Sequence, residues 1–210
     1  MPRMRRSGMC CLRGRATYGL RWRLLLAVVA GALAVASLGE AAWLGAKAEL
    51  GQYLIGRAWQ RSQRGEEAPQ PWPWADTQPV ARLAVPAHGV ELLVLAGGTG
   101  HTLAWGPGHL AGTAPVGAPF GNAVVAGHRD THFGFLRELR RGDEIQVENA
   151  EGEQSVYRVE ASYVTHDADS SVLEATEEAR LTLVTCWPFD APFPGGPERY
   201  VVEAAAVASD

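Results

Sequence analysis

A long apolar stretch dominates the first part of the chain. Residues 24–39 contain no charged side chain, and after Glu40 the apolar character continues to residue 46. The 23 positions 24–46 can form a helix that crosses a bilayer, which requires about 20 residues. The pattern remains compatible with a helix to about residue 63. We therefore expect a transmembrane signal-anchor helix at 24–46 that continues into a helical stalk.

The polar residues after this helix indicate a connection rather than another element. Residues 64–79 (RGEEAPQPWPWADTQP) are rich in Pro, Glu and Gln, which is typical of a linker. Together with the helical stalk, this linker occupies residues 47–79. Trp72 and Trp74 depart from the polar composition, and we expect them to dock the linker onto the domain that follows.

From residue 80 onward, short β-branched or alternating runs recur between Gly and Pro residues, which predicts strands separated by turns. The predicted strands are Arg82–Val85, Val90–Ala96, Asn122–Ala126, Glu144–Asn149, Ser155–Val164, Leu181–Thr185 and Tyr200–Ala206. We expect short helices near residues 101–105 and 133–140. The pattern predicts an all-β domain at residues 80–208, a barrel or sandwich of seven or eight strands.

The charges are distributed unevenly. Residues 1–23 carry seven of the 19 basic residues and no acid, so the remaining 12 basic residues and all 23 acidic ones give the rest of the chain a formal charge of −11. A basic cytoplasmic head at residues 1–23 fits the positive-inside rule and orients the domain away from the cytoplasm. An acidic domain argues against a nucleic-acid partner.

A cleaved signal peptide is the alternative for the N-terminal segment. Residues 34–36 (AVA) form an A-x-A cleavage pattern after a short apolar core. The long basic head and the helical pattern that continues past the apolar run favour the uncleaved anchor. We therefore expect a single-pass protein of the inner (cytoplasmic) membrane with its catalytic domain in the periplasm or another extracytoplasmic space.

The three cysteines provide no pattern for a disulfide framework or a metal site. Cys10 and Cys11 are adjacent in the basic head, and Cys186 is alone in the predicted domain. His132 follows His128 by four residues, but no third ligand is near them in the sequence. We therefore expect no metal and no cofactor.

Three segments combine predicted strands with chemically capable side chains. His128 follows an apolar strand in NAVVAGHRDTHFGFLREL (122–139), Cys186 ends the strand of LTLVTCWPFD (181–190), and Arg199 begins the strand of PERYVVEA (197–204). Taken separately, each residue also fits a structural role, as a small buried hydrophobe, a histidine at the barrel rim or a solvated strand arginine.

Together the three segments resemble the sortases. That family has a TLxTC strand end, an upstream Gly-His and a downstream strand arginine, which here are residues 182–186 (TLVTC), Gly127-His128 and Arg199. The resemblance covers about residues 80–207. The short chain, the arginine-rich anchor and the GHRDTHF string are most similar to class D and to the Gram-negative marine proteobacterial sortases.

The resemblance implies a sortase-type barrel that acts as a cysteine transpeptidase. Cys186 would cleave a C-terminal LPxTG-like sorting signal and form a thioacyl intermediate, since the thiolate is the nucleophilic form of cysteine. His128 would exchange protons with the leaving and incoming amines. Arg199 does not lose its proton at usable pH, so its role would be electrostatic, at the substrate carbonyl or oxyanion.

Further substrate contacts are expected on both sides of the nucleophile, from Val184, Thr185 and Trp187. The aromatic and proline-rich segment 187–197 (WPFDAPFPGGP) is suited to form a stiff apolar wall along an extended peptide. The implied partners are a membrane-held protein with a C-terminal sorting signal, an amine acyl acceptor and the membrane.

Three alternatives to the transpeptidase are considered. A thiol hydrolase or protease would use the same residues and transfer the acyl group to water. A non-catalytic peptide-binding β-barrel would simply bury Cys186. An L,D-transpeptidase is disfavoured, because that family places its cysteine shortly after the histidine in an S-x-G-C-like loop, whereas here 58 positions separate Cys186 from His128.

Overall fold

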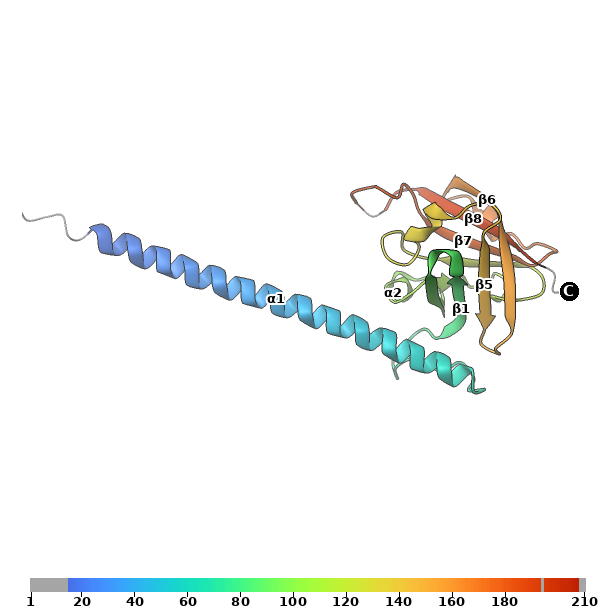
Figure 1. Cartoon of the computed structure of the whole chain (residues 1–210), viewed down its shortest axis with the longest axis horizontal. Coiled ribbons are helices and arrows are strands. Elements are labelled where there is room, and N and C mark those ends of the chain that lie inside the picture. Colours follow the sequence, from blue (N-terminus) through green and yellow to red (C-terminus); the bar gives the residue numbers. More distant parts are fainter. Residues whose placement is uncertain (1–14, 194, 208–210) are drawn as a thin grey trace, which may run out of the picture. The chain divides into compact units, whose positions relative to one another are not determined.

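The computed structural model describes residues 15–193 and 195–207 of the chain (Figure 1). They belong to two compact units, Met1–Ala48 and Glu49–Asp210. Cys10, Cys11 and the first part of the predicted basic head lie outside the described residues.

The first unit consists of the N-terminal part of helix α1 (Arg15–Ser62). Within the described residues, one helical segment is long and apolar enough to cross a membrane, Leu25–Ser62, with a peak mean hydropathy of 2.0 over 18 residues. The large apolar side chains described in the first unit are exposed, for example Leu33 by 64% and Leu38 by 71%. Exposed apolar side chains of this kind are typical of a helix that is surrounded by lipid in a membrane.

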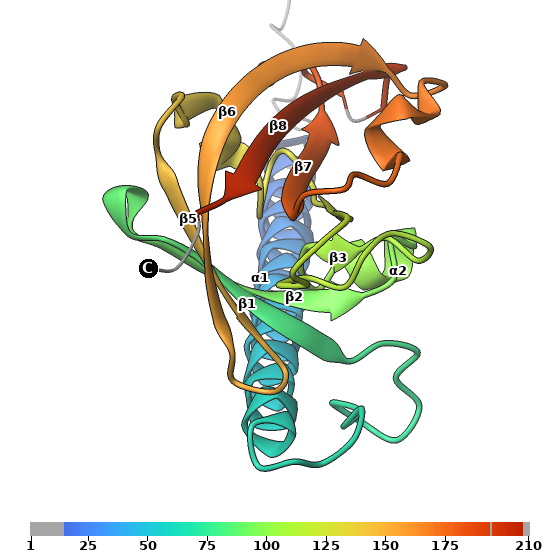
Figure 2. The ribbon, with the colours of Figure 1, turned by 90° about the vertical axis from the view of Figure 1, so that its right-hand side faces the viewer.

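The second unit contains a closed barrel in the strand order β1-β2-β3-β4-β7-β8-β6-β5 (Figure 2). The strands are β1 (Pro79–Val85), β2 (Val90–Ala96), β3 (Gly108–His109), β4 (Asn122–Ala126), β5 (Glu144–Asn149), β6 (Gln154–His166), β7 (Arg180–Cys186) and β8 (Glu198–Ala206). Four short helices connect them: η1 (Pro86–His88), α2 (Gly100–Leu103), η2 (Gly134–Glu138) and η3 (Ser170–Leu173).

The prediction of a seven- or eight-stranded barrel is confirmed. All seven predicted strands lie within observed strands, and α2 and η2 overlap the two predicted helical regions. The eighth strand, β3, was not predicted because its two residues are too short to produce an alternating pattern. It pairs in parallel with β2 and antiparallel with β4, which closes the barrel between them.

Alternation along β7 determines which side chains reach the core. Leu181 and Leu183 are fully buried in the same apolar cluster as Val202 and Ala204 of β8. Since successive strand residues point to opposite faces, Thr185 shares the inward face, and Cys186 lies on the outward face. Burying a leucine side chain stabilises the fold by about 1.5–3 kcal/mol, which fixes this register firmly.

Within the second unit, the segment predicted as stalk and linker packs on the barrel. Ile55 and Ala58 of α1 are buried, and Gln63 donates to the backbone carbonyls of Asn149 and Ala150 at 3.0 and 3.2 Å. The linker is also docked, through Trp72, whose ring centroid is 5.2 Å from that of Trp105. Trp74, which was expected to dock as well, is 82% exposed.

Candidate active site

Cys186 and Arg199 are brought together by strand pairing. Cys186 ends β7, is partly buried and is free of any disulfide among the described residues. The antiparallel register of β7 and β8 places Arg199 directly opposite it. Directly opposite residues share a face of the sheet and have Cβ atoms about 4.5–5.5 Å apart. Residues 13 positions apart in the sequence thus become neighbours on the outer face of the barrel.

His128 reaches the same edge of the sheet from β4. Strands β4 and β7 are parallel, and their last paired residues are Ala126 and Val184. The amide of Gly127 donates to the carbonyl of Val184 at 3.0 Å, which continues the pairing by one step. Extension of the same register by a further step would bring His128 level with Cys186, because the carboxyl ends of adjacent parallel strands meet at one edge. The imidazole is exposed.

Thr185 joins the ends of β4 and β7 from the inside of the barrel. Its side chain is 2% exposed, and its hydroxyl donates to the carbonyl of Gly127 at 2.7 Å. The residue before Cys186 therefore holds the residue before His128. Substrate contacts by Thr185 and Val184 stay predictions, and the buried hydroxyl of Thr185 has a structural partner already.

The guanidinium of Arg199 is held by the polypeptide around it. Its Nη1 donates to the carbonyls of Gly196 and Glu198 at 2.6 and 2.9 Å, and Nη2 contacts a carboxylate oxygen of Asp167 at 3.3 Å. Asp167 belongs to the connection between β6 and β7. These bonds engage three of the five N–H donors of a guanidinium and fix its plane.

The residue after Cys186 belongs to an aromatic cluster. Trp187 stacks on Tyr200 with ring centroids 5.6 Å apart, and Phe189 meets both rings edge-on at 5.6 and 5.1 Å. With Arg137 and Asp190, these rings line a pocket of about 370 Å³. Trp187 and Phe189 thus lie together as apolar rings directly after Cys186, and their contact with a peptide substrate stays a prediction.

Sequence reasoning missed Arg129, the residue after His128. Its side chain is 4% exposed, and it donates to the carbonyl of Pro188, to the carbonyl of Ala191 at 3.1 Å and to Asp130 at 2.9 Å. The hydrogen bond from Arg129 holds the pKa of the Asp130 carboxyl below its ordinary value. The signal in the sequence is the charged Arg-Asp pair directly after His128 in the GHRDTHF string.

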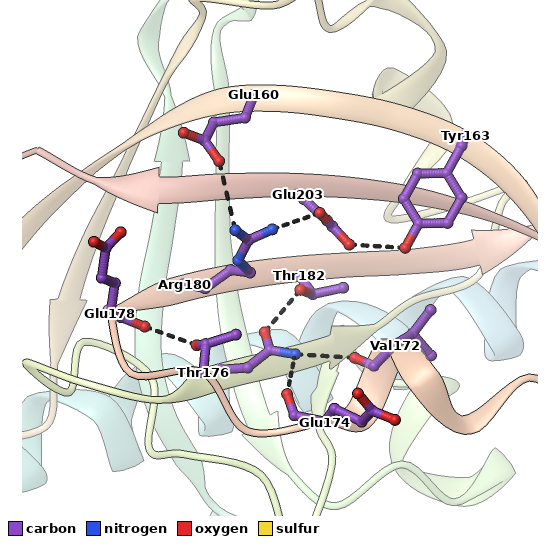
Figure 3. A network of polar contacts seen from close by, with 10 residues as sticks. Glu160, Tyr163, Val172, Glu174, Thr176, Glu178, Arg180, Thr182 and Glu203 are labelled. Carbon is purple, nitrogen blue, oxygen red and sulfur yellow. Dashed lines mark hydrogen bonds and ion pairs between the residues drawn. The ribbon is translucent and has the colours of Figure 1, made fainter.

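The connection between β6 and β7 covers the outer face of β4 and β7. The buried Asn122 accepts from the hydroxyl of Thr182 at 2.7 Å and donates to the carbonyls of Val172 and Glu174 at 3.0 and 3.2 Å. The bonds to these two carbonyls are drawn in Figure 3. This connection, which also supplies Asp167, therefore borders the site.

A second polar cluster lies on the outer face beside this connection. Arg180 is paired with Glu160 and Glu203, and Glu203 accepts from the hydroxyl of Tyr163 at 2.7 Å (Figure 3). Burial and the neighbouring Glu203 raise the pKa of Tyr163 to about 12. Tyr163 therefore stays protonated at neutral pH and acts as a hydrogen-bond donor that fixes β8 against β6.

His132 lies close enough to His128 for the charge of His128 to affect the pKa of His132. Burial, with a smaller contribution from the charge of His128, lowers the pKa of His132 below its ordinary value. His132 is therefore favoured in its neutral form. Among the residues that the structure describes, no group of three or more His, Cys, Asp or Glu side chains could hold a metal ion.

The similarity of this chain to known proteins covers the barrel domain. A family model described as "Sortase domain" matches residues 83–207. The chain is 31% identical over 120 residues to sortase D of Bacillus subtilis (strain 168) and 32% identical over 111 residues to sortase A of Listeria monocytogenes. These matches cover 57% and 51% of this chain, and 60% and 49% of the relatives, so the chain spans only part of their length.

Solved structures show the same fold. Sortase A from Corynebacterium diphtheriae matches with a TM-score of 0.57 and 29% identity, covering 65% of this chain and 64% of that one. A sortase D5 transpeptidase of Clostridium perfringens matches with a TM-score of 0.61 and 24% identity, covering 76% of this chain and 99% of that one.

Proposed function

We propose that this chain, which belongs to the sortase family, is a membrane-anchored cysteine transpeptidase. Its substrate would be a membrane-held protein with a C-terminal LPxTG-like sorting signal, and its acyl acceptor an amine. The convergence of residues 128, 186 and 199 at one edge of the barrel carries this proposal.

The first half of the proposed reaction forms a thioester. The thiolate of Cys186 attacks the carbonyl carbon of the threonine in the sorting signal and gives a tetrahedral oxyanion. The two N–H groups of Arg199 not engaged by Gly196, Glu198 and Asp167 would bind this oxygen. The oxyanion collapses, the C–N bond breaks, and the imidazolium of His128 protonates the departing amine.

The second half transfers the acyl group. The neutral imidazole of His128 takes a proton from the acceptor amine, which attacks the thioester carbonyl and displaces the thiolate of Cys186. The aromatic wall of Trp187 and Phe189 beside the nucleophile is suited to exclude water from the thioester. Exclusion of water favours transfer to the amine over hydrolysis.

Catalytic variants of the full-length protein in detergent test the proposal. With an LPxTG-type peptide and an added amine, mass spectrometry should detect a Cys186-linked acyl-enzyme and the amine-coupled product. Cys186→Ala should abolish both. His128→Ala should lower kcat about 10²–10⁴-fold, and Arg199→Met about 10²–10³-fold. The double substitution of Cys10 and Cys11 by Ser is the control and should keep wild-type activity.

The same assay separates the alternatives. Peptide cleavage that gives the same hydrolysed product with and without the amine would identify a thiol hydrolase. Peptide binding without any acyl-enzyme, together with a thiol at Cys186 inert to alkylation, would identify a non-catalytic binding barrel. Turnover remaining in Cys186→Ala would end the assignment of the nucleophile.

The proposed location follows from the N-terminal unit. The apolar helix is long enough to span a bilayer once. The arginine-rich residues before it favour the cytoplasmic side, so the barrel would lie outside the cytoplasm, where sorting signals of exported proteins are exposed.

A further inference from the structure

We infer that Arg129 is a positioning residue, whose guanidinium latches the loop that carries His128 to the loop that follows Cys186. The inference rests on the proposed function for its effect on catalysis. Its effect on the thiol of Cys186 stands independently of any substrate.

The contacts of Arg129 span the two loops directly. The residue itself is bonded in the chain to His128, and its Nη1 and Nη2 donate to the carbonyls of Pro188 and Ala191. Those carbonyls lie two and five positions after Cys186. The planar fork of a guanidinium has fixed donor directions, so two such bonds define both the distance and the angle between the loops.

Burying the charged side chain of Arg129 costs free energy that an apolar side chain in the same place would not cost, so packing alone does not explain an arginine here. Removing a charged group from water costs several kcal/mol unless partners compensate. The described carboxylate that pairs with it is Asp130, whose side chain is 63% exposed. Most of the compensation at the buried end therefore comes from the two carbonyls, and an apolar side chain would fill the same space at lower cost.

The latch also brings a positive charge to the nucleophile. The pKa of Arg129 is raised above its ordinary value, first by the hydrogen bond to Asp130 and further by the charges of Asp130, Cys186 and Asp190. The guanidinium of Arg129 therefore lies within electrostatic reach of the sulfur of Cys186. A cation close to a thiol favours the thiolate, the form that alkylating reagents trap, so the rate of alkylation of Cys186 is a readout of this proximity.

Three variants of the full-length protein test the latch. Arg129→Met keeps the length of the side chain without charge or donors, and Arg129→Lys keeps the charge without the fork. Asp130→Asn is the matched control, because it leaves the guanidinium and both carbonyl bonds in place. Measurements are the rate of Cys186 alkylation by iodoacetamide at pH 7, read on the Cys186 peptide by mass, and kcat and KM for an LPxTG-type peptide.

Arg129→Met should slow alkylation about fivefold or more, because the thiolate loses a neighbouring cation. Its kcat should fall about 10–100-fold with KM within about twofold, because the imidazole and thiol lose their alignment. Arg129→Lys should restore alkylation more than kcat, and Asp130→Asn should stay within about twofold of wild type in both.

A purely structural role gives a different result. Arg129→Met would then lower the melting temperature while the folded protein kept wild-type alkylation and kcat, and this would overturn the inference. If Arg129→Met does not fold, Arg129→Lys decides, since wild-type kcat in that variant overturns the latch. If the wild type cleaves no peptide, the proposed function fails, and alkylation alone still decides on Arg129.

Discussion

Single side chains at the barrel edge join neighbouring strands through hydrogen bonds that their residue type alone does not predict. Thr185 has the β-branched side chain expected in a strand, yet its hydroxyl bonds the carbonyl of Gly127 at 2.7 Å in a buried place. The residues that follow the two bonded residues are Cys186 and His128. One hydroxyl thus ties together the ends of β4 and β7.

Thr185→Val should therefore be more harmful than its conservative shape suggests. It leaves the buried carbonyl of Gly127 without its side-chain donor, which costs about 1–3 kcal/mol of unfolding free energy. Thr185→Ser keeps the hydroxyl, loses one methyl group and should cost about 1 kcal/mol or less. Denaturant unfolding of both variants in the same detergent measures the difference, and equal stability would show that the bond contributes nothing.

At the scale of elements, short polar bonds tie the connections to the strands. Asp143, just before β5, accepts from the amide of Arg140 after η2 at 2.8 Å and contacts His88 of η1 at 3.4 Å. Three elements near one end of the barrel therefore meet at one carboxylate. The amide hydrogen bond, with a smaller contribution from His88, lowers the pKa of Asp143 below its ordinary value.

This shift predicts how stability responds to acid. Because the carboxyl binds a proton more weakly in the folded state, its contribution is complete above its ordinary pKa near 3.9 and is lost as the pH falls through the lower folded value. The difference in unfolding free energy between wild type and Asp143→Asn should therefore shrink between about pH 5 and pH 3.

The control for this experiment is Glu144→Gln, which removes an exposed ion pair with Arg158. An exposed pair contributes about 0–1 kcal/mol, so its variant should follow the wild-type pH dependence closely. A difference for Asp143→Asn that stayed constant from pH 7 to pH 3 would contradict the assignment.

At the scale of the whole second unit, the barrel is joined by the last turns of α1. Gly51 lies so close to Trp105 that an added Cβ would sit 2.1 Å from a ring carbon. Trp105 also accepts from Gln52 through its carbonyl at 2.7 Å and packs on Trp72. The glycine permits this close contact between helix and barrel.

Gly51→Ala should loosen that contact, because the ring of Trp105 must move to admit the methyl group, at a cost of about 1–3 kcal/mol. Gly56→Ala is the matched control, since its Cβ would meet no atom within 4 Å. In a helix that change should stabilise by about 0.5–1 kcal/mol. Hydrogen exchange of residues 52–62 should become faster in the first variant and not in the second; equally slow exchange in both would refute the prediction.

Much of this protein was determined by the sequence itself. Alternation of apolar residues predicted seven strands, because a barrel with one buried face requires a period of two along each strand. The uninterrupted apolar run predicted a long helix, and α1 extends to Ser62. His128, Cys186 and Arg199 could be named because the Gly-His, TLxTC and strand-arginine pattern resembles that of the sortases. Their places at the ends of patterned strands put them at a barrel edge.

How these residues are held depends on contacts that form only in the folded barrel. The roles of Thr185 and Arg129 depend on carbonyl groups at Gly127, Pro188 and Ala191, 58 to 62 positions away in the chain. Backbone carbonyls are the same for every residue type, so a sequence does not indicate which of them a side chain will meet. The parallel register of β4 and β7 creates those meetings, and strand register is a property of the closed sheet.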